Sequence, residues 1–510
     1  MMGEISANNR RIAKNTLVLY VRMIFITLIT LFTSRVVLNI LGVEDYGIYS
    51  VVGGIVAFVG ILKGAMSSTT MRFLTYELGR NDLERLKETF CISRMIYVVI
   101  CLIFLILSES VGLWFLNSHL IIPNERILAA NLVYQFTIFS FVIEMLAQPY
   151  NAAVLSHERM KFFSYISILE AVLKLVIVFL LLILPSDRLI TYGILIMCVS
   201  LIVRVSYHIY CRHNFQECRF IIYRNWPLFK EIFIYSSWNL FGAASSLVKG
   251  QGQNILLNMF FIPAVTAASA LSYQVYHGVS LLGQNFYMAV QPQITKYYAK
   301  NDLGNMFKLV FRSSKLSIYL NLIIGLPLLL ETDAFIKIWL GQIPEYVICF
   351  TKIAIITSLI HTMAHPIMTS IHATGHMALY QSLVGTIDVL SLPISYLFLL
   401  NGFLPVIVFQ VSLGITIVNL FVRTLILKHL IPQFPLLHYV VSVLGGGFVV
   451  FVLSCVIPFI VQKMMNSSSL KFIIVSVICV FSVFVTAFFI GLKRDERLFL
   501  LQFAKNKSVR

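Results

Sequence analysis

The chain is dominated by long apolar stretches separated by short polar segments. A helix that crosses a bilayer needs roughly 20 mostly apolar residues, because each residue adds about 1.5 Å. Since backbone polar groups in lipid must be satisfied internally, each such stretch is predicted to be a helix. The expected fold class is an all-α polytopic membrane protein of about 14 transmembrane helices, with approximate limits 16–41, 46–76, 88–116, 127–155, 162–184, 188–212, 231–261, 265–295, 308–330, 346–374, 377–400, 403–430, 437–461 and 470–491.

Composition and charge exclude other classes. Charged residues make up 12% of the chain and hydrophobic residues 59%, whereas soluble domains carry about 25% charged residues. The formal net charge of +17 does not indicate nucleic-acid binding, because the basic residues lie in short loops rather than in one stripe. The first apolar stretch shows no small-residue cleavage site, so it is predicted to be a spanning helix rather than a signal peptide.

The distribution of basic residues predicts the orientation. With the N-terminus inside, 28 of the 39 Lys and Arg residues lie in cytoplasmic segments or helix ends, six lie outside, and five lie within spans. Cytoplasmic segments of membrane proteins carry this excess of Lys and Arg. The predicted location is the inner membrane, with both termini in the cytoplasm.

An internal repeat divides the chain. Residues 79–83 (GRNDL) are echoed by residues 299–303 (AKNDL), an offset of 220, and Pro149 by Pro366, an offset of 217. Spans 1–6 and 7–12 are therefore predicted to be two copies of one six-helix unit, a common transporter design. The predicted domains are residues 1–215, residues 216–432, and two accessory helices with a basic tail in residues 433–510.

Five cations lie within the predicted spans. Charges near the bilayer centre normally face a cavity or a partner, because burial in lipid is costly. Arg22 and Lys63 are predicted to bind an anion from a cavity, although snorkelling or a distant ion pair also fits. Arg35 is also a candidate for substrate binding, but it lies near the outer end of its span, so snorkelling to the interface is an equal alternative. Lys174 follows Glu170 by four residues, so an intrahelical ion pair competes with a ligand-binding role.

Lys249 lies in an unusual polar segment of the seventh span. It is followed by Gly250, Gln251, Gly252, Gln253 and Asn254. Two glycines and several polar side chains predict an interrupted helix with a substrate site near the bilayer midplane. The competing interpretation is close glycine-mediated helix packing with polar bonds between helices.

The acids of the spans are coupling candidates. Desolvated carboxylates such as those of Glu144, Glu170 and Asp388 readily take up a proton, so they could couple transport to H⁺ or Na⁺. Structural ion pairs with the buried cations are an equal alternative.

Four histidines, His361, His365, His372 and His376, share the tenth span at helical spacing. They lack an accompanying acid or cysteine, so packing contacts are favoured over a metal site. No nucleotide-binding loop or nucleophile elbow is found, and neither an enzyme nor a cofactor is expected.

Several short motifs resemble a known family. Leu41-Gly42 followed by Tyr46-Gly47 resembles the Leu-Gly-x-x-x-Tyr-Gly signature of polysaccharide-unit (O-antigen/capsule, Wzx-like) flippases of the MOP exporter superfamily. The 79–82 loop is similar as well. The resemblance implies transport, by alternating access between two lobes, of an undecaprenyl-pyrophosphate-linked oligosaccharide from the inner to the outer leaflet.

The resemblance also implies partners and a site. Membrane lipids and a polysaccharide polymerase are the expected partners, with no nucleic acid. Arg22, Lys63 and Lys249 match the expected cationic lumen in position and sign. Two alternatives remain: a MATE-like antiporter of cationic drugs, and a non-transporting scaffold of a polysaccharide synthesis complex.

Overall fold

The computed structural model describes residues 2–119, 123–183, 187–219, 223, 225–341, 343–465, 469–492 and 497. Every regular element in these ranges is a helix. The chain forms two compact units: an N-terminal unit, Ala13–Leu240, and a C-terminal unit, Phe241–Arg510 together with Met1–Ile12. Their boundary lies within helix α7 (Trp226–Phe260) rather than at the predicted residues 215 and 216. Residues 433–510 belong to the same unit as the helices before them.

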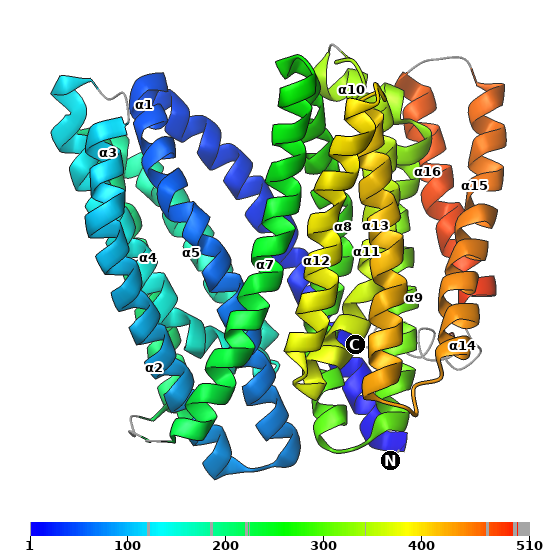
Figure 1. Ribbon diagram of the computed structural model, residues 1–510, viewed down its shortest axis with the longest axis horizontal. Coiled ribbons are helices and arrows are strands. Elements are labelled where there is room, and N and C mark those ends of the chain that lie inside the picture. Colours follow the sequence, from blue (N-terminus) through cyan, green and yellow to red (C-terminus); the bar gives the residue numbers. More distant parts are fainter. Residues whose placement is uncertain are drawn as a thin grey trace. The chain divides into compact units, whose positions relative to one another are not determined.

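The N-terminal unit begins with a helix that turns back on itself. Helix α1 (Met2–Arg80) has non-helical backbone angles at Gly42 (φ 77°, ψ 170°), so the first two predicted spans are its two arms (Figure 1). Only glycine adopts such a positive φ at little cost. The motif that carried the family resemblance therefore contains the turn between the first two spans.

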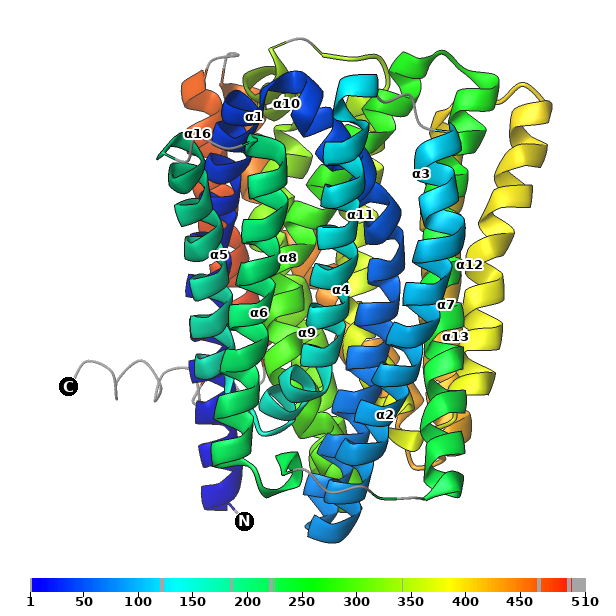
Figure 2. The same cartoon turned by 90° about the vertical axis from the view of Figure 1, so that its left-hand side faces the viewer.

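The rest of this unit packs around one central helix. Helix α2 (Leu83–Leu107) continues through a π-helical turn (Ser108–Gly112) into α3 (Leu113–His119). Helices α5 (Met160–Ile183) and α6 (Arg188–Asn214) follow α4 (Ile127–Ser156). Helices α2, α5 and α6 all contact α4, and Figure 2 shows α4 and α6 side by side.

The C-terminal unit is a second helical bundle. Helix α11 contacts α8, α9 and α13 and so forms its centre. The last two long helices, α15 and α16, pack against each other and against α9 (Figure 1). The helices after α7 are α8 (Pro263–Ala299), α9 (Leu303–Leu330), α10 (Thr332–Leu340), α11 (Val347–Thr374), α12 (Met377–Leu400), α13 (Val406–Leu430), α14 (Leu436–Tyr439), α15 (Gly446–Met464) and α16 (Ser469–Thr486).

The helices suit a lipid environment. Large apolar side chains are exposed on their outer faces, among them Ile183 (77% exposed) and Phe481 (70%), which water would not favour. Each of the fourteen predicted stretches coincides with helix. Eleven helices in the described part of the chain are long and apolar enough to cross a membrane. The all-α membrane fold is thus confirmed, whereas the count of about 14 spans is not.

The two halves of the predicted repeat share their turn geometry. Asn81 (φ 58°) and Asn301 (φ 56°) both adopt the left-handed conformation. In both halves the next residue caps the following helix: the side chain of Asp82 accepts from the amide of Arg85, and that of Asp302 from the amide of Asn305. Such capping satisfies an amide that has no partner within its helix.

The turns after α4 and α11 also correspond. Glu158 (φ 58°) and Gly375 (φ 87°) have positive φ at the offset of 217, and helices α5 and α12 begin at Met160 and Met377. Matching turns at two places in each half support the repeat predicted from the sequence.

Candidate functional site

The predicted site residues of the N-terminal unit whose side chains the structure describes come together in one polar cluster. Lys63, on the second arm of α1, places its Nζ 2.6 Å from Oε2 of Glu144 on α4. About a third of each side chain is exposed. The Oγ of Ser200 on α6 donates a second hydrogen bond to Glu144 (3.2 Å). Lys63 therefore has a carboxylate partner 81 residues away in the chain.

The second pair of this cluster lies within one helix. The Nζ of Lys174 is 2.7 Å from Oε1 of Glu170, one turn earlier on α5. This is the intrahelical pair that the spacing predicted as an alternative to ligand binding. Lys174 also lies within electrostatic range of Glu144, which links the two pairs.

Arg22 extends the cluster on the first arm of α1. It lies within electrostatic range of Glu170 and Tyr207, and its guanidinium lies 4.4 Å from the centre of the Phe163 ring. Its Nε has no hydrogen-bond partner among the described residues. We call Arg22, Glu170, Lys174, Glu144 and Lys63 the charge chain of the N-terminal unit. With three cations and two carboxylates, it carries one excess positive charge.

The pair of the C-terminal unit is more buried. Lys249 on α7 places its Nζ 2.9 Å from Oδ1 of Asp388 on α12, and each side chain is 15% exposed. Asp388 was a coupling candidate and Lys249 a candidate for cargo binding. Here, as in the charge chain, a lysine predicted to bind the cargo forms an ion pair with an acid predicted to couple transport to an ion.

The polar segment after Lys249 does not interrupt its helix, because α7 is continuous from Trp226 to Phe260. A Cβ placed on Gly252 would lie 2.5 Å from the side chain of Leu392 on α12, so this glycine permits close packing of two helices. The expected break is absent, and the competing interpretation, glycine-mediated packing, describes the segment.

The polar side chains of this segment have different surroundings. Gln253 is buried and accepts a hydrogen bond from the hydroxyl of Tyr273. Asn254 accepts from Ser269 (3.2 Å), whereas Gln251 is exposed. Arg35 lies on α1, and its side chain falls outside the described residues.

The histidines of α11 contact aromatic rings and each other. The rings of His361 and His365 are 5.0 Å apart, His365 stacks on Tyr287 (4.8 Å), and His372 contacts Tyr380 (5.5 Å). These are the packing contacts that were favoured over a metal site.

Sequence reasoning missed a buried arginine in the same unit. Arg423 on α13, which the sequence placed among the cytoplasmic helix-end cations, is only 7% exposed. It lies within electrostatic range of Tyr380 and His365. Its position seven residues before the end of α13 suggested a helix end, and only packing shows that it points inward.

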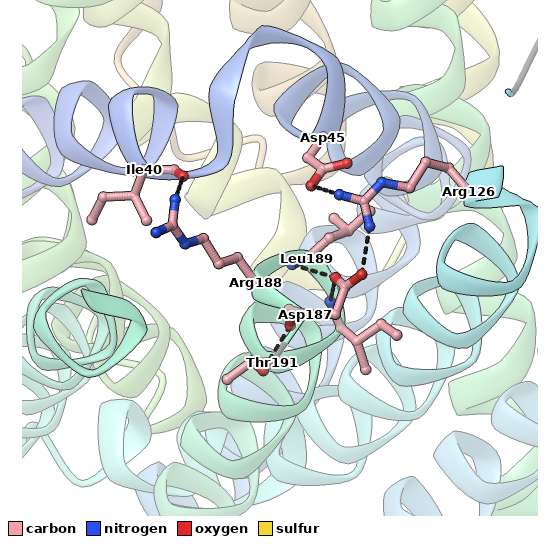
Figure 3. A network of polar contacts seen from close by, with 8 residues as sticks. Ile40, Asp45, Arg126, Asp187, Arg188, Leu189 and Thr191 are labelled. Atoms are coloured by element: carbon pink, nitrogen blue, oxygen red, sulfur yellow. Dashed lines mark hydrogen bonds and ion pairs between the residues drawn. The ribbon is translucent and has the colours of Figure 1, made fainter. Parts of the chain in front are cut away.

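A second missed network fixes the turn of α1 (Figure 3). Arg126, before α4, contacts two carboxylates: its Nη2 lies 2.7 Å from Asp45, and its Nη1 contacts Asp187. Asp187 also caps α6 by accepting from the amides of Leu189 and Ile190. Arg188 donates to the carbonyl of Ile40 (3.1 Å).

This network joins three parts of the N-terminal unit. It connects the residues around Gly42 to the beginnings of α4 and α6, so the two arms of α1 are held at their junction. Arg126 and Arg188 are two of the six basic residues that the distribution of charge predicts to lie outside.

Comparison with known proteins identifies the fold. No protein-family model matches the chain, and no curated protein does so either. Solved structures of transporters do match, at TM-scores between 0.64 and 0.72 for those compared.

Three of these structures illustrate the likeness. A multidrug resistance MATE family transporter of the MOP superfamily, in an outward-facing conformation, has a TM-score of 0.72 at 10% identity, covering 82% of this chain and 96% of that one. A MATE protein in the bent conformation has 0.71 at 12% identity, covering 83% and 96%. A variant of the Vibrio cholerae MATE transporter VcmN has 0.66 at 14% identity, covering 84% and 98%. The chain therefore has the MATE-like fold.

Proposed function

We propose that this protein is a flippase of the inner membrane, with cytoplasmic termini, that moves undecaprenyl-pyrophosphate-linked oligosaccharide units to the outer leaflet. The fold supports membrane transport, because solved structures of the same fold are described as transporters. The motif at Leu41-Gly42 and Tyr46-Gly47 resembles that of polysaccharide-unit flippases, and Gly42 forms the turn of α1.

The observation that carries the proposed cargo is the excess positive charge of the charge chain. A drug exporter that binds cations would need carboxylates free to receive them. Here Glu144 and Glu170 are each already bound to a lysine at 2.6 and 2.7 Å, while the Nε of Arg22 has no hydrogen-bond partner in the part of the chain that the structure describes. This arrangement favours an anion such as a pyrophosphate, which arginine and lysine bind through charge-assisted hydrogen bonds.

Binding of such a cargo requires an exchange of partners. A phosphate oxygen would take Lys63 from Glu144, and the pair is accessible enough for this because about a third of each side chain is exposed. A carboxylate that loses its cation in a low-dielectric interior is poorly stabilised and takes up H⁺ or Na⁺. Cargo binding would thereby be coupled to an ion, with Glu144, Glu170 and Asp388 as the groups concerned.

The proposed cycle is alternating access. Arg22 and Lys63 receive the pyrophosphate from the cytoplasmic side, Lys249 contacts it later, and Gln251, which is exposed on the same helix as Lys249, supplies a polar contact. The lipid tail remains in the bilayer. A polysaccharide polymerase would then use the unit in the outer leaflet.

The test is where the lipid-linked glycan accumulates in cells that lack the protein. We expect it in the cytoplasmic leaflet, with loss of surface polysaccharide that the wild-type chain restores. The variant Arg22→Ala/Lys63→Ala should not restore it. Lys161→Ala, which removes an exposed lysine of the same unit, is the matched control and should restore it.

Further variants separate a transport defect from a folding defect. Lys63→Ala/Glu144→Ala removes both charges of one pair and so leaves no unpaired carboxylate. If this variant is present at wild-type levels and still fails to restore the glycan, the pair of Lys63 and Glu144 acts in transport and not only in folding. Normal surface polysaccharide without the protein contradicts the proposal.

Two other functions predict different results. A MATE-like drug antiporter is favoured by one observation, the multidrug resistance transporter among the similar structures. It predicts efflux of cationic dyes that Arg22→Ala leaves intact and that a substituted acid abolishes. A scaffold without transport activity predicts normal polysaccharide when every charge-chain cation is neutralised.

A further inference from the structure

Helices α7 and α8 form an antiparallel hairpin in the C-terminal unit. Helix α8 begins directly after the short turn that ends α7, and two hydrogen bonds join the helices. The hydroxyl of Tyr273 donates to Gln253, and that of Ser269 donates to Asn254 (3.2 Å). These two contacts show which faces of the helices meet and which of their residues lie at the same level.

Exposed polar side chains recur on one face of α8. Gln274, His277 and Gln284 are all exposed, and their spacing places them on one side of the helix. Gln251, exposed on α7, lies level with Gln274 in the hairpin. On each helix these side chains lie roughly a quarter turn from the residues that bond the other helix, in the sense that brings them to the same side of the hairpin. We call these four residues the polar face of the hairpin.

The opposite face of α8 is packed, and its polar groups bond other helices. The hydroxyl of Ser272 lies 3.0 Å from that of Thr351, and the hydroxyl of Ser280 lies 2.8 Å from that of Ser358, both on α11. The hydroxyl groups of α8 thus join helices within the unit. The amides and the imidazole of the polar face take no part in these contacts, so packing of the bundle does not account for them.

The polar face lies at membrane depth. Gln274 and His277 follow the first residue of α8, Pro263, by about 16 and 21 Å along the axis, and the hydrocarbon core is about 30 Å thick. Neither α7 nor α8 is among the eleven helices that are both long and apolar enough to cross a membrane. An amide exposed to hydrocarbon is costly, because it finds no hydrogen-bond partner there. The polar face is therefore expected to border water, from which a polar ligand can reach it.

The chemistry of this face indicates an uncharged ligand. Residues 263–295 contain no Asp, Glu, Lys or Arg, so α8 offers no charge to an ion along this length. Glutamine amides and a neutral imidazole each donate and accept hydrogen bonds, as sugar hydroxyls also do. The stretch from Gln274 to Gln284 extends about 15 Å, a length that suits an extended chain of sugars.

From these observations we propose that the polar face of the hairpin binds the uncharged sugars of the oligosaccharide that this protein moves. The inference rests on the proposed function and divides recognition of the cargo between two sets of residues. The charge chain of the N-terminal unit binds the pyrophosphate, whereas the amides and the imidazole of the C-terminal unit bind sugar hydroxyls. The polar face would thereby select the glycan, which the charge chain does not distinguish.

The test compares two ligands of the purified full-length protein in detergent. One is the lipid-linked oligosaccharide extracted from cells that lack the protein. The other is undecaprenyl pyrophosphate, which has the same lipid and pyrophosphate without the sugars. The affinity for each is measured by microscale thermophoresis. We expect the wild type to bind the glycosylated lipid more tightly, because only this ligand contacts both the cations and the polar face.

Substitutions on α8 should remove this preference. One hydrogen bond between neutral groups corresponds to about a fivefold change in affinity. Gln274→Leu should therefore weaken binding of the glycosylated lipid about fivefold, and Gln274→Leu/Gln284→Leu about 25-fold, with no change for undecaprenyl pyrophosphate. Gln433→Leu, which replaces an exposed glutamine in the turn after α13, is the matched control and should keep both affinities. A misfolded variant would lose affinity for both ligands, so it cannot imitate a selective loss.

The contrary results have distinct meanings. An equal ratio of the two affinities in the wild type and in Gln274→Leu/Gln284→Leu overturns the proposal, because the face then holds only water or membrane lipid. A higher unfolding temperature of that variant would identify lipid, since leucine suits hydrocarbon better than glutamine does. Loss of both affinities in Arg22→Ala/Lys63→Ala would still support the proposed function in that case. If the wild type binds neither ligand, the proposed function itself is contradicted, and this inference with it.

Discussion

The ion pair of Lys249 and Asp388 allows its effect on stability to be measured separately from the proposed role of Lys249 in binding the cargo. At 2.9 Å and an effective dielectric constant of about 20, two unit charges attract by about 6 kcal/mol. Desolvation of the two groups costs several kcal/mol for each ion, so the intact pair contributes little net stability. Removal of one partner, however, leaves the other charge buried without compensation.

The size of this effect follows from burial. Breaking a fully buried pair costs about 3–5 kcal/mol, and because each side chain is 15% exposed we expect the lower end, about 3 kcal/mol, for Asp388→Asn or Lys249→Gln alone. The double variant Lys249→Gln/Asp388→Asn leaves two neutral amides. It should lie within about 1 kcal/mol of the wild type, because no unpaired charge remains.

The assay combines thermal unfolding of the purified protein with restoration of surface polysaccharide. If Lys249 binds the cargo, the double variant regains stability but loses about 10-fold or more in transport, which corresponds to one charge-assisted hydrogen bond. If the pair is only structural, the double variant regains both. Losses in the single variants that simply add in the double variant would refute the reasoning, because they would show that the two charges do not interact.

Three further predictions concern the framework. Arg126→Gln removes the cation beside the buried carboxylate of Asp45 (8% exposed) and should lower the free energy of unfolding by about 2 kcal/mol. An unchanged unfolding temperature would contradict this prediction. Gly283→Ala places a Cβ 2.5 Å from a threonine methyl and should destabilise by about 1–3 kcal/mol, whereas Gly250→Ala, with open space around it, should stabilise by about 0.5–1 kcal/mol. If the two glycine variants shift the unfolding temperature in the same direction, crowding of the added methyl group does not explain their effects. Asp302→Ala removes a helix cap and should lower the free energy of unfolding by about 1 kcal/mol, as measured by urea or thermal denaturation. Asp302→Asn keeps a side chain that can cap the helix and should lose much less stability.

The predicted spans agree with the observed helices because a helix in lipid is specified locally. The expected span 188–212 is α6, Arg188–Asn214, and the expected span 377–400 is α12, Met377–Leu400. Each satisfies its own backbone hydrogen bonds, so apolar length alone locates it. Asn81 and Asn301 adopt the same turn, as the predicted repeat leads us to expect, because such turns depend on adjacent residues.

Contacts within one helix could be predicted as well, but contacts between helices could not. The pair of Glu170 and Lys174 follows from their spacing on α5. The partner of Lys63 is 81 residues away, and that of Lys249 is 139 residues away. Which face of one helix meets which face of another depends on side-chain packing along both, and single-sequence periodicity does not supply it.

The sequence by itself therefore determined an all-helical membrane fold, it predicted a repeated unit, and it selected charged residues that lie within the spans. The tertiary structure decided that Lys63 and Lys249 each bind a predicted acid, that α7 is unbroken at Gly252, and that Arg423 is buried. The physical reason is the distance along the chain over which each requirement acts. Lipid imposes its demand for apolar length and internal hydrogen bonds residue by residue, whereas the neighbours of a buried charge are set only when separate helices pack together.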